Sequence, residues 1–379
     1  FWMWCSALLG MCTKFAEVTL AVHFRERSDT GEWVGGPMYY IKNGLSKNWH
    51  WLAALYSLFG VLTVFGTGNA TQVNTIVTAI DSALTAYGDF SKSMLSTVNL
   101  VAGVLVAMLV AMVLLGGIKR IGSVTEKLVP FMALFYVVLA LGVVILNIRR
   151  FPAVLASIVG GAFDPRAFTG GAIGSVFLSM QKGVSRGIFS NEAGLGTGSI
   201  AHACADTRKP VKQGMFGIFE VFMDTIVICT ITALAVLASG VWTQEGLSSG
   251  QLALAAFQSV FGNFGAIFVA ITVFMFVFST IISAGFFGQI QAEILFGRKF
   301  SKIWVFMYPL FIGIACAFSN VTTMYMITDG FMAIIVILNM IGLLLMCKQV
   351  KDLQKEYYNT PGMYYLADKA AKEAKKAAK

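Results

Sequence analysis

Charged residues are scarce in this sequence. Asp, Glu, Lys and Arg make up 12% of the 379 residues, and hydrophobic residues make up 57%. Soluble domains average about 25% charged and 45–50% apolar residues. A soluble enzyme with a mean hydropathy of +0.75 would have to expose large apolar patches to water, which is incompatible with solubility. The composition therefore excludes ordinary soluble proteins and indicates a polytopic membrane protein.

Cysteine and histidine are also few, and their spacing excludes several kinds of site. The six cysteines form no C-x-x-C pair, and there are only three histidines, so neither a metal site built from Cys and His nor a disulfide framework is predicted. Residues 246–250 (GLSSG) fit the nucleophile-elbow pattern, but no predicted strand precedes them, as that turn requires. We therefore predict that the protein is not an enzyme.

Long apolar runs are the main feature of the sequence. A helix that crosses a bilayer needs about 20 predominantly apolar residues. The sequence has nine candidate runs, near residues 1–22, 51–77, 95–117, 128–147, 168–190, 214–239, 255–288, 304–318 and 324–347. In the seventh run, Gly262, Asn263 and Gly265 predict a division into a short surface helix and a span. The sequence thus predicts a transmembrane domain over residues 1–347 and a Lys-rich tail over residues 348–379.

The basic residues are distributed unevenly among the connections between these runs. Alternate connections, with the tail included, hold 21 of the 28 Lys and Arg residues, and the remaining connections hold four. Cytoplasmic loops of membrane proteins carry such an excess, so we expect a protein of the cell membrane with a cytoplasmic C-terminus. The net charge of +9 is then explained by topology, and the expected partner is the lipid bilayer, not nucleic acid.

Polar residues interrupt the second apolar run. Gly66 and Gly68 weaken the helix there and allow another backbone or a ligand to approach closely. Asn69, Gln72 and Asn74 contribute amides that cannot face lipid cheaply. The segment predicts a site for a polar solute or an ion; polar contacts between packed helices are the alternative.

A glycine pair, Gly170 and Gly171, opens the fifth run. An interrupted helix exposes free N–H groups, which can bind an anion such as a carboxylate. The alternative is close helix packing, since Gly170 and Gly174 form a G-x-x-x-G pair.

Three hydroxyl residues, Ser279, Thr280 and Ser283, lie together in the seventh run. Adjacent hydroxyl and carbonyl oxygens form a shell of hard ligands that suits a small monovalent cation. The alternative is that each hydroxyl donates to the helix carbonyl one turn earlier, which is common in membrane spans.

Charged side chains within the runs are few. Lys14 and Glu17 are three residues apart in a predicted helix, and we expect them to pair with each other. Glu220 and Asp224 are four residues apart in the sixth run, so that they share a helix face and are candidate proton carriers.

Motifs spread over nearly the whole chain resemble those of one family. The matching segments are Phe1–Gly10 (FWMWCSALLG), Gly35–Tyr40 (GGPMYY), Gly66–Asn74 (GTGNATQVN), Arg186–Gly194 (RGIFSNEAG) and Ser279–Ile282 (STII). They occur in the order in which the family has them. Together they resemble the alanine or glycine:cation symporter family, which is also described as the sodium:alanine symporter family.

The resemblance implies symport of a small neutral amino acid, such as alanine or glycine, with a co-transported sodium ion by alternating access. It implies an all-α fold of the leucine-transporter type, with a five-plus-five inverted repeat. On that scheme the nine runs are core helices two to ten. The family's extra N-terminal helix and its first core helix would precede Phe1, so the chain is expected to lack its N-terminal part.

The resemblance also carries roles to particular residues. The implied substrate-binding residues are Gly170, Gly171, Gln72, Asn74 and Thr280, to which the amide of Asn69 is added from the polar cluster. The implied sodium ligands are Ser279, Thr280 and Ser283. Of these, Gly170 and Gly171 would present their backbone to the substrate carboxylate.

One position departs from the family pattern. After the Ser-Thr-Ile-Ile motif the family tends to carry a tryptophan, whereas this chain has Ala284. If the tryptophan closes the side-chain end of the pocket, Ala284 predicts a larger cavity and larger substrates than alanine.

Two other functions remain open from the residues. Coupling to protons through Glu220 or Asp224 on the same fold is the nearer alternative. A channel is the other, but a channel needs a continuous polar stripe or a carbonyl filter, and the polar residues here fall into separate clusters.

Overall fold

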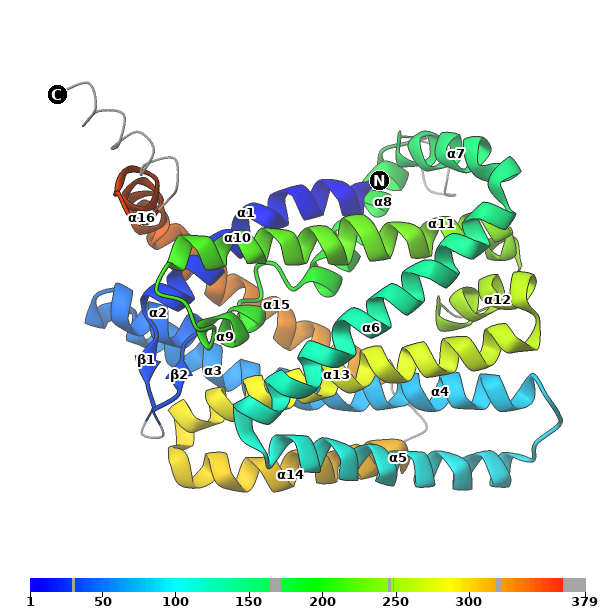
Figure 1. The fold of residues 1–379 in the computed structure, drawn as a ribbon, viewed down its shortest axis with the longest axis horizontal. Coiled ribbons are helices and arrows are strands. Elements are labelled where there is room, and N and C mark those ends of the chain that lie inside the picture. Colours follow the sequence, from blue (N-terminus) through cyan, green and yellow to red (C-terminus); the bar gives the residue numbers. More distant parts are fainter. Residues whose placement is uncertain (29–30, 164–171, 245–246, 248, 318–321, 364–379) are drawn as a thin grey trace. The chain divides into compact units, whose positions relative to one another are not determined.

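The computed structural model describes residues 1–379 except 29–30, 164–171, 245–246, 248, 318–321 and 364–379 (Figure 1). The chain divides into two compact units. Unit 1 consists of Phe1–Trp2, Leu58–Val184 and Asp224–Met332, and unit 2 consists of Met3–Ser57, Ser185–Met223 and Ala333–Lys379.

Helices make up most of the described chain, as the apolar runs predict. The α-helices are α1 (Trp2–His23), α2 (Pro37–Gly44), α3 (His50–Phe65), α4 (Thr71–Thr85), α5 (Lys92–Leu114), α6 (Gly117–Leu146), α7 (Phe151–Phe163), α8 (Ala172–Asn191), α9 (Thr197–Ala203), α10 (Pro210–Val221), α11 (Thr230–Ser239), α12 (Ser249–Phe261), α13 (Asn263–Phe296), α14 (Arg298–Ala317), α15 (Thr322–Leu345) and α16 (Cys347–Asn359).

Shorter elements connect these helices. Three are 3-10 helices: η1 (Lys47–Trp49), η3 (Ile148–Arg150) and η5 (Val241–Thr243). Two are π-helices, η2 (Gly66–Ala70) and η4 (Phe222–Cys229). The strands β1 (Glu26–Arg27) and β2 (Trp33–Val34) pair antiparallel, with Glu26 opposite Val34.

Seven helical segments are long and apolar enough to cross a membrane, judged by length and composition over the described residues. They are Trp2–His23, Lys47–Thr85, Lys92–Leu114, Gly117–Leu146, Pro210–Ser239, Asn263–Phe296 and Met326–Leu345. They correspond to seven of the nine predicted runs. The fifth and eighth runs fall on α8 and α14, which are helical over the described residues. The count of nine membrane spans therefore stays a prediction, and so does the five-plus-five inverted repeat.

The predicted division of the seventh run is confirmed. The short helix α12 ends at Phe261 and α13 begins at Asn263. Between them Gly262 has a φ of 59°, in the left-handed region that glycine adopts without a steric penalty.

Helix α13 is the central element of unit 1. It packs against α4, α6, α12 and α14, while α5 packs on α14 and α11 on α6 (Figure 1). One apolar core lies where α6, α11, α12 and α13 meet, formed by Ala140, Val143, Val144, Ala235, Phe257, Phe268 and Val269. Since many residues of α13 are buried, the polar groups on its buried faces must find partners inside the protein.

Unit 2 is held together by contacts of α1 and α10. A Cβ added at Gly214 or Gly217 of α10 would lie within 3.0 Å of the α1 side chains Thr19 and Val18, respectively. The absence of side chains at these two positions therefore lets the helices approach closely. Helix α16 packs on α10, and α9 packs on α2 and β2.

Candidate functional site

The predicted weak point of the second run is a π-helix. Segment η2 lies between α3 and α4, and single π turns inside helices are frequent at functional sites. A Cβ on Gly68 would lie 2.5 Å from the Cβ of Ala284 in α13, and a Cβ on Gly66 would overlap Thr328 of α15. The close approach predicted from these two glycines is thus confirmed.

Tyr308 of α14 fastens η2 to α13. Its hydroxyl lies 2.7 Å from the carbonyl oxygen of Gly68 and 3.0 Å from that of Ile281. Its own carbonyl accepts a hydrogen bond from Asn69 Nδ2 at 3.0 Å. One turn earlier, Trp304 Nε1 donates to the carbonyl of Gly285 at 2.9 Å. These fully buried groups hold the π turn in place; we call them the η2 junction.

The η2 junction leaves one acceptor unused. Asn69 is fully buried, and its Oδ1 has no hydrogen-bond partner among the described residues. Only the amide nitrogen can donate to the Tyr308 carbonyl, so the orientation of the amide follows from that bond. A buried oxygen without a partner is costly, and it could be satisfied by a cation or an ammonium group.

The three predicted sodium ligands each donate a hydrogen bond to a carbonyl of their own helix, α13. Ser279 Oγ and Thr280 Oγ1 donate to the carbonyl of Phe276 at 2.7 and 3.0 Å, and Ser283 Oγ donates to the carbonyl of Ser279 at 3.0 Å. Each hydroxyl uses its proton in this way and keeps lone pairs that can bind a cation.

The three hydroxyls do not all point to one place. Ser279 and Ser283 are four residues apart and share a face of α13, and Ser279 is buried. Thr280 is exposed in this structure and lies a helical step of about 100° away. Ser279 and Ser283 are therefore the pair whose oxygens the helix brings together.

The other predicted substrate contacts lie on or near η2. Gln72 and Asn74 are half-buried on α4, and Gln72 is three residues after Asn69, on the same side of the helix. Gly170 and Gly171 lie outside the described residues.

Ala284 packs directly on the η2 junction. Its Cβ faces Gly68, and the side chain is 9% exposed. On this side a larger residue would meet the backbone of Gly68, so the predicted larger cavity would have to extend away from η2.

In unit 2 the fully buried Lys14 forms an ion pair with the partly exposed Glu220, and not with the partner that the sequence analysis expected. Lys14 Nζ lies 3.2 Å from Glu220 Oε1 and donates to the Asn191 carbonyl at 3.1 Å. The expected Lys14–Glu17 pair is not formed. Glu17 instead accepts hydrogen bonds from the Gly194 N–H at 2.9 Å and from Asn339 Nδ2 at 2.7 Å. Residues three apart on a helix can form an ion pair. In the structure, however, the ammonium of Lys14 lies within ion-pair distance of the carboxylate of Glu220 on α10, and not of that of Glu17 on its own helix.

A histidine extends this ion pair. His202 Nε2 lies 2.7 Å from Glu220 Oε2, and Gln213 Nε2 lies 2.9 Å from His202 Nδ1. The amide nitrogen can only donate, so Nδ1 accepts and the ring proton lies on Nε2, facing the carboxylate. We call Lys14, Glu220, His202 and Gln213 the ion network. Because Lys14 and His202 hold Glu220, the predicted proton carrier is already engaged in two interactions.

The sequence offered little to find this network. Lys14 and Glu220 are 206 positions apart in the numbering, and Asn339 and Tyr40, which hydrogen-bond each other beside Glu17, come from α15 and α2. Polar residues in apolar runs are a signal that partners exist. They do not say which helices will supply them.

Comparison with known proteins identifies what the chain is similar to. The sodium:alanine symporter family matches residues 1–367. The uncharacterized transporter YflA of Bacillus subtilis is 40% identical over 374 residues, 97% of this chain and 75% of that protein. The sodium/alanine symporter AgcS of Methanococcus maripaludis is 35% identical over 362 residues, 94% and 76%. The probable sodium/glutamine symporter GlnT of Bacillus subtilis is 35% identical over 360 residues, 94% and 71%.

Proposed function

The chain belongs to the sodium:alanine symporter family, and from that premise we propose that it couples the entry of a small neutral amino acid to sodium by alternating access. The family is one of membrane transporters and not of enzymes, which agrees with the seven apolar segments of the described chain. The observation that carries the proposal is the match of nearly the whole chain to this family.

Sodium is proposed to bind at Ser279 and Ser283, with Thr280 as a further ligand. The hydroxyl oxygens keep free lone pairs beside helix carbonyls, and hard oxygen ligands suit sodium. The proposed site needs no carboxylate, so sodium can leave it again without opening a buried ion pair.

The substrate is proposed to bind next to the η2 junction. The unpartnered Asn69 Oδ1 supplies an acceptor for an ammonium group, and Gln72, Asn74 and Thr280 supply further polar contacts. Gly170 and Gly171 are proposed to present backbone N–H groups to the substrate carboxylate.

Relatives of this chain are named for alanine and for glutamine, which supports a range of substrates that includes amino acids larger than alanine. Ala284 is proposed as the residue that determines how large a substrate side chain is accepted. The variant Ala284→Trp, whose ring must turn away from Gly68, should reduce competition by glutamine more than competition by alanine in protein that still elutes as folded on size exclusion. Unchanged competition by both would contradict this assignment.

The direct test is uptake of labelled alanine by proteoliposomes that contain the protein, under an imposed gradient of sodium, of potassium or of protons. Accumulation with inward sodium alone is the expected result. Uptake with a proton gradient and no sodium would contradict the proposal and favour coupling through Glu220 or Asp224. Unlabelled glycine, serine, leucine and glutamine as competitors would then define the substrate class.

The remaining parts of the proposal concern topology. The distribution of Lys and Arg supports a cytoplasmic C-terminus, and the family supports a fold of the leucine-transporter type with nine spans in this chain. A cysteine scan of the tail with a membrane-impermeant reagent on whole cells should leave the tail unlabelled until the cells are opened.

A further inference from the structure

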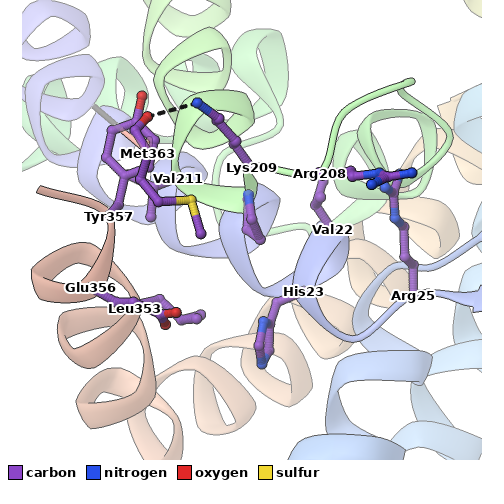
Figure 2. A pocket seen from close by; sticks show the side chains of 11 residues that line it. Val22, His23, Arg25, Arg208, Lys209, Val211, Leu353, Glu356, Tyr357 and Met363 are labelled. Carbon is purple, nitrogen blue, oxygen red and sulfur yellow. Dashed lines mark hydrogen bonds between the residues drawn. The ribbon is translucent and has the colours of Figure 1, made fainter. Parts of the chain in front are cut away.

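A pocket of about 260 Å³ lies in unit 2, and none of its lining residues is among those assigned above to sodium or substrate. Figure 2 shows the side chains that line it. They come from α1 and the residues just after it, from the connection between α9 and α10 and the start of α10, and from α16 and the residues just after it. Its volume is close to the lower end of the range for ligand pockets, about 300 Å³. It therefore has room for a single polar headgroup or a small ion, and not for a large solute.

The pocket lining is basic. It includes Arg25, Arg208, Lys209 and His23, and a single carboxylate, Glu356. No carboxylate of the described residues forms an ion pair within 4.0 Å with either arginine or the lysine. The charge of Asp206 acts on Arg25 and Glu356 lies in the lining, so the three cations still outnumber these two carboxylates.

Two of these cations are held in position by uncharged groups. The guanidinium of Arg25 donates to the carbonyls of Ala203, at 2.9 Å, and Ala205, at 2.7 Å. Burial, together with the charge of Arg27, lowers the pKa of Arg25. These carbonyls orient the side chain, but they leave its full charge in place.

Lys209 is held in a similar way. Its Nζ donates to the carbonyls of Gly362 at 2.8 Å and Met363 at 2.9 Å (Figure 2). The chain that continues from Met363 has five lysines against one Asp and one Glu over residues 364–379, so by charge it is a poor counter-ion for the pocket. Arg208 is exposed and makes no hydrogen bond or ion pair to the described residues.

The pocket lies where apolar segments end. α1 ends at His23, α10 begins at Pro210, and both belong to segments long and apolar enough to cross a membrane. Basic pockets at the ends of membrane helices suit lipid phosphates. We propose that this pocket binds a phosphate-bearing anion, supplied by the headgroup of an anionic phospholipid or by free phosphate, with Arg208 as the residue that contacts it.

Binding is tested on the purified protein in a neutral detergent, by its thermal unfolding temperature and by native mass spectrometry. The probes are phosphatidylglycerol, phosphatidylcholine and inorganic phosphate. We expect phosphatidylglycerol to raise the unfolding temperature and to remain bound, and phosphatidylcholine to do neither. Stabilisation by inorganic phosphate, without phosphatidylglycerol, would instead identify free phosphate as the source. Failure of both anionic probes would overturn the proposal.

Three variants assign the binding to this pocket. Arg208→Gln should raise the half-maximal concentration of the anionic probe about fivefold, as expected for one basic residue at a lipid surface. Lys351→Gln removes the same charge from an exposed position of α16 outside the pocket lining and serves as the matched control. Glu356→Gln removes the carboxylate of the lining and should strengthen binding.

The opposite signs of these effects distinguish binding from a general loss of structure. Arg208→Gln and Glu356→Gln should both elute like the parent protein on size exclusion, because both side chains are exposed. Equal weakening by Arg208→Gln and Lys351→Gln would place the lipid elsewhere and overturn the assignment. None of these measurements depends on transport, so their outcome is independent of the proposed symport.

Discussion

The η2 junction and the ion network are both polar groups inside an apolar chain, but they differ in charge. The η2 junction and the nearby hydroxyls of α13 are neutral, and one oxygen, Asn69 Oδ1, lacks a partner. In the ion network the fully buried Lys14 is paired with Glu220, which is itself held by His202. A neutral site can accept and release a cation at small cost, whereas opening the ion pair would leave the buried ammonium of Lys14 without a partner of opposite charge. On the proposed function, the neutral groups of unit 1 are therefore the candidates for binding sodium and the transported amino acid, and the ion network of unit 2 is a candidate for stabilising the fold.

The largest effect is expected in the ion network. Glu220→Gln leaves the ammonium of Lys14 buried without its carboxylate and should lower the free energy of unfolding by about 3–5 kcal/mol. Lys14→Met leaves Glu220, whose side chain is 43% exposed and can turn to water and His202, so the loss should be smaller, about 1–2 kcal/mol. Denaturant unfolding in detergent measures both. Equal losses would show that the burial of Lys14 is not the source of the asymmetry.

At the proposed sodium ligands Ser279 and Ser283 we expect a smaller effect on stability than in the ion network, and a larger effect on transport. Ser279→Ala and Ser283→Ala each remove one oxygen and should raise the sodium concentration for half-maximal uptake about tenfold, equivalent to about 1.4 kcal/mol. Ser301→Ala, at a buried hydroxyl of α14, is the control. If the serine variants behaved like this control in sodium titrations of uptake, the sodium site would lie elsewhere.

The contact between Gly68 and Ala284 offers a sharper test of the η2 junction. Gly68→Ala would place two Cβ atoms 2.5 Å apart and should destabilise the protein by about 1–3 kcal/mol through overpacking. Ala284→Gly removes the opposing methyl and should restore most of that loss in the double variant. A double-mutant cycle with a coupling energy below about 0.5 kcal/mol would argue against direct contact.

The smallest effect concerns two cysteines of unit 2. Burial raises the pKa of the Cys204 thiol to about 12, and the thiol donates to the carbonyl of Trp33 at 3.2 Å. Since the thiolate is the reactive form, maleimide should label exposed Cys347 and leave Cys204 unlabelled at pH 8. Labelling of Cys204 should rise as the pH approaches 12. Rapid labelling of Cys204 at pH 8, followed by mass spectrometry of its peptide, would contradict this burial.

Some features of the fold could be predicted from local pattern alone. Apolar runs of about 20 residues can satisfy their backbone groups in lipid only as helices, so the helices were predictable one by one. The break at Gly262 and the weak helix at Gly66 and Gly68 were predictable in the same way, because a glycine acts on its own backbone. Both appear where they were expected.

The partners of the polar side chains could not be predicted in this manner. Lys14 was expected to pair with Glu17 on its own helix, but it pairs with Glu220. The hydroxyls of Ser279 and Ser283 suggested a cation shell, and in the structure they first satisfy carbonyls of α13. Periodicity along a helix gives the face on which a residue lies, and it does not say which helix will cover that face.

The sequence by itself determined that this chain is a helical membrane protein of the sodium:alanine symporter family, because composition, apolar length and family motifs are local properties of the chain. Only the tertiary structure decided that Tyr308 closes over Gly68, that Glu220 neutralises Lys14, and that Arg25 and Lys209 line one basic pocket. Such meetings depend on how helices distant in sequence pack together, and in an apolar interior each polar group must take the partner that packing brings within reach.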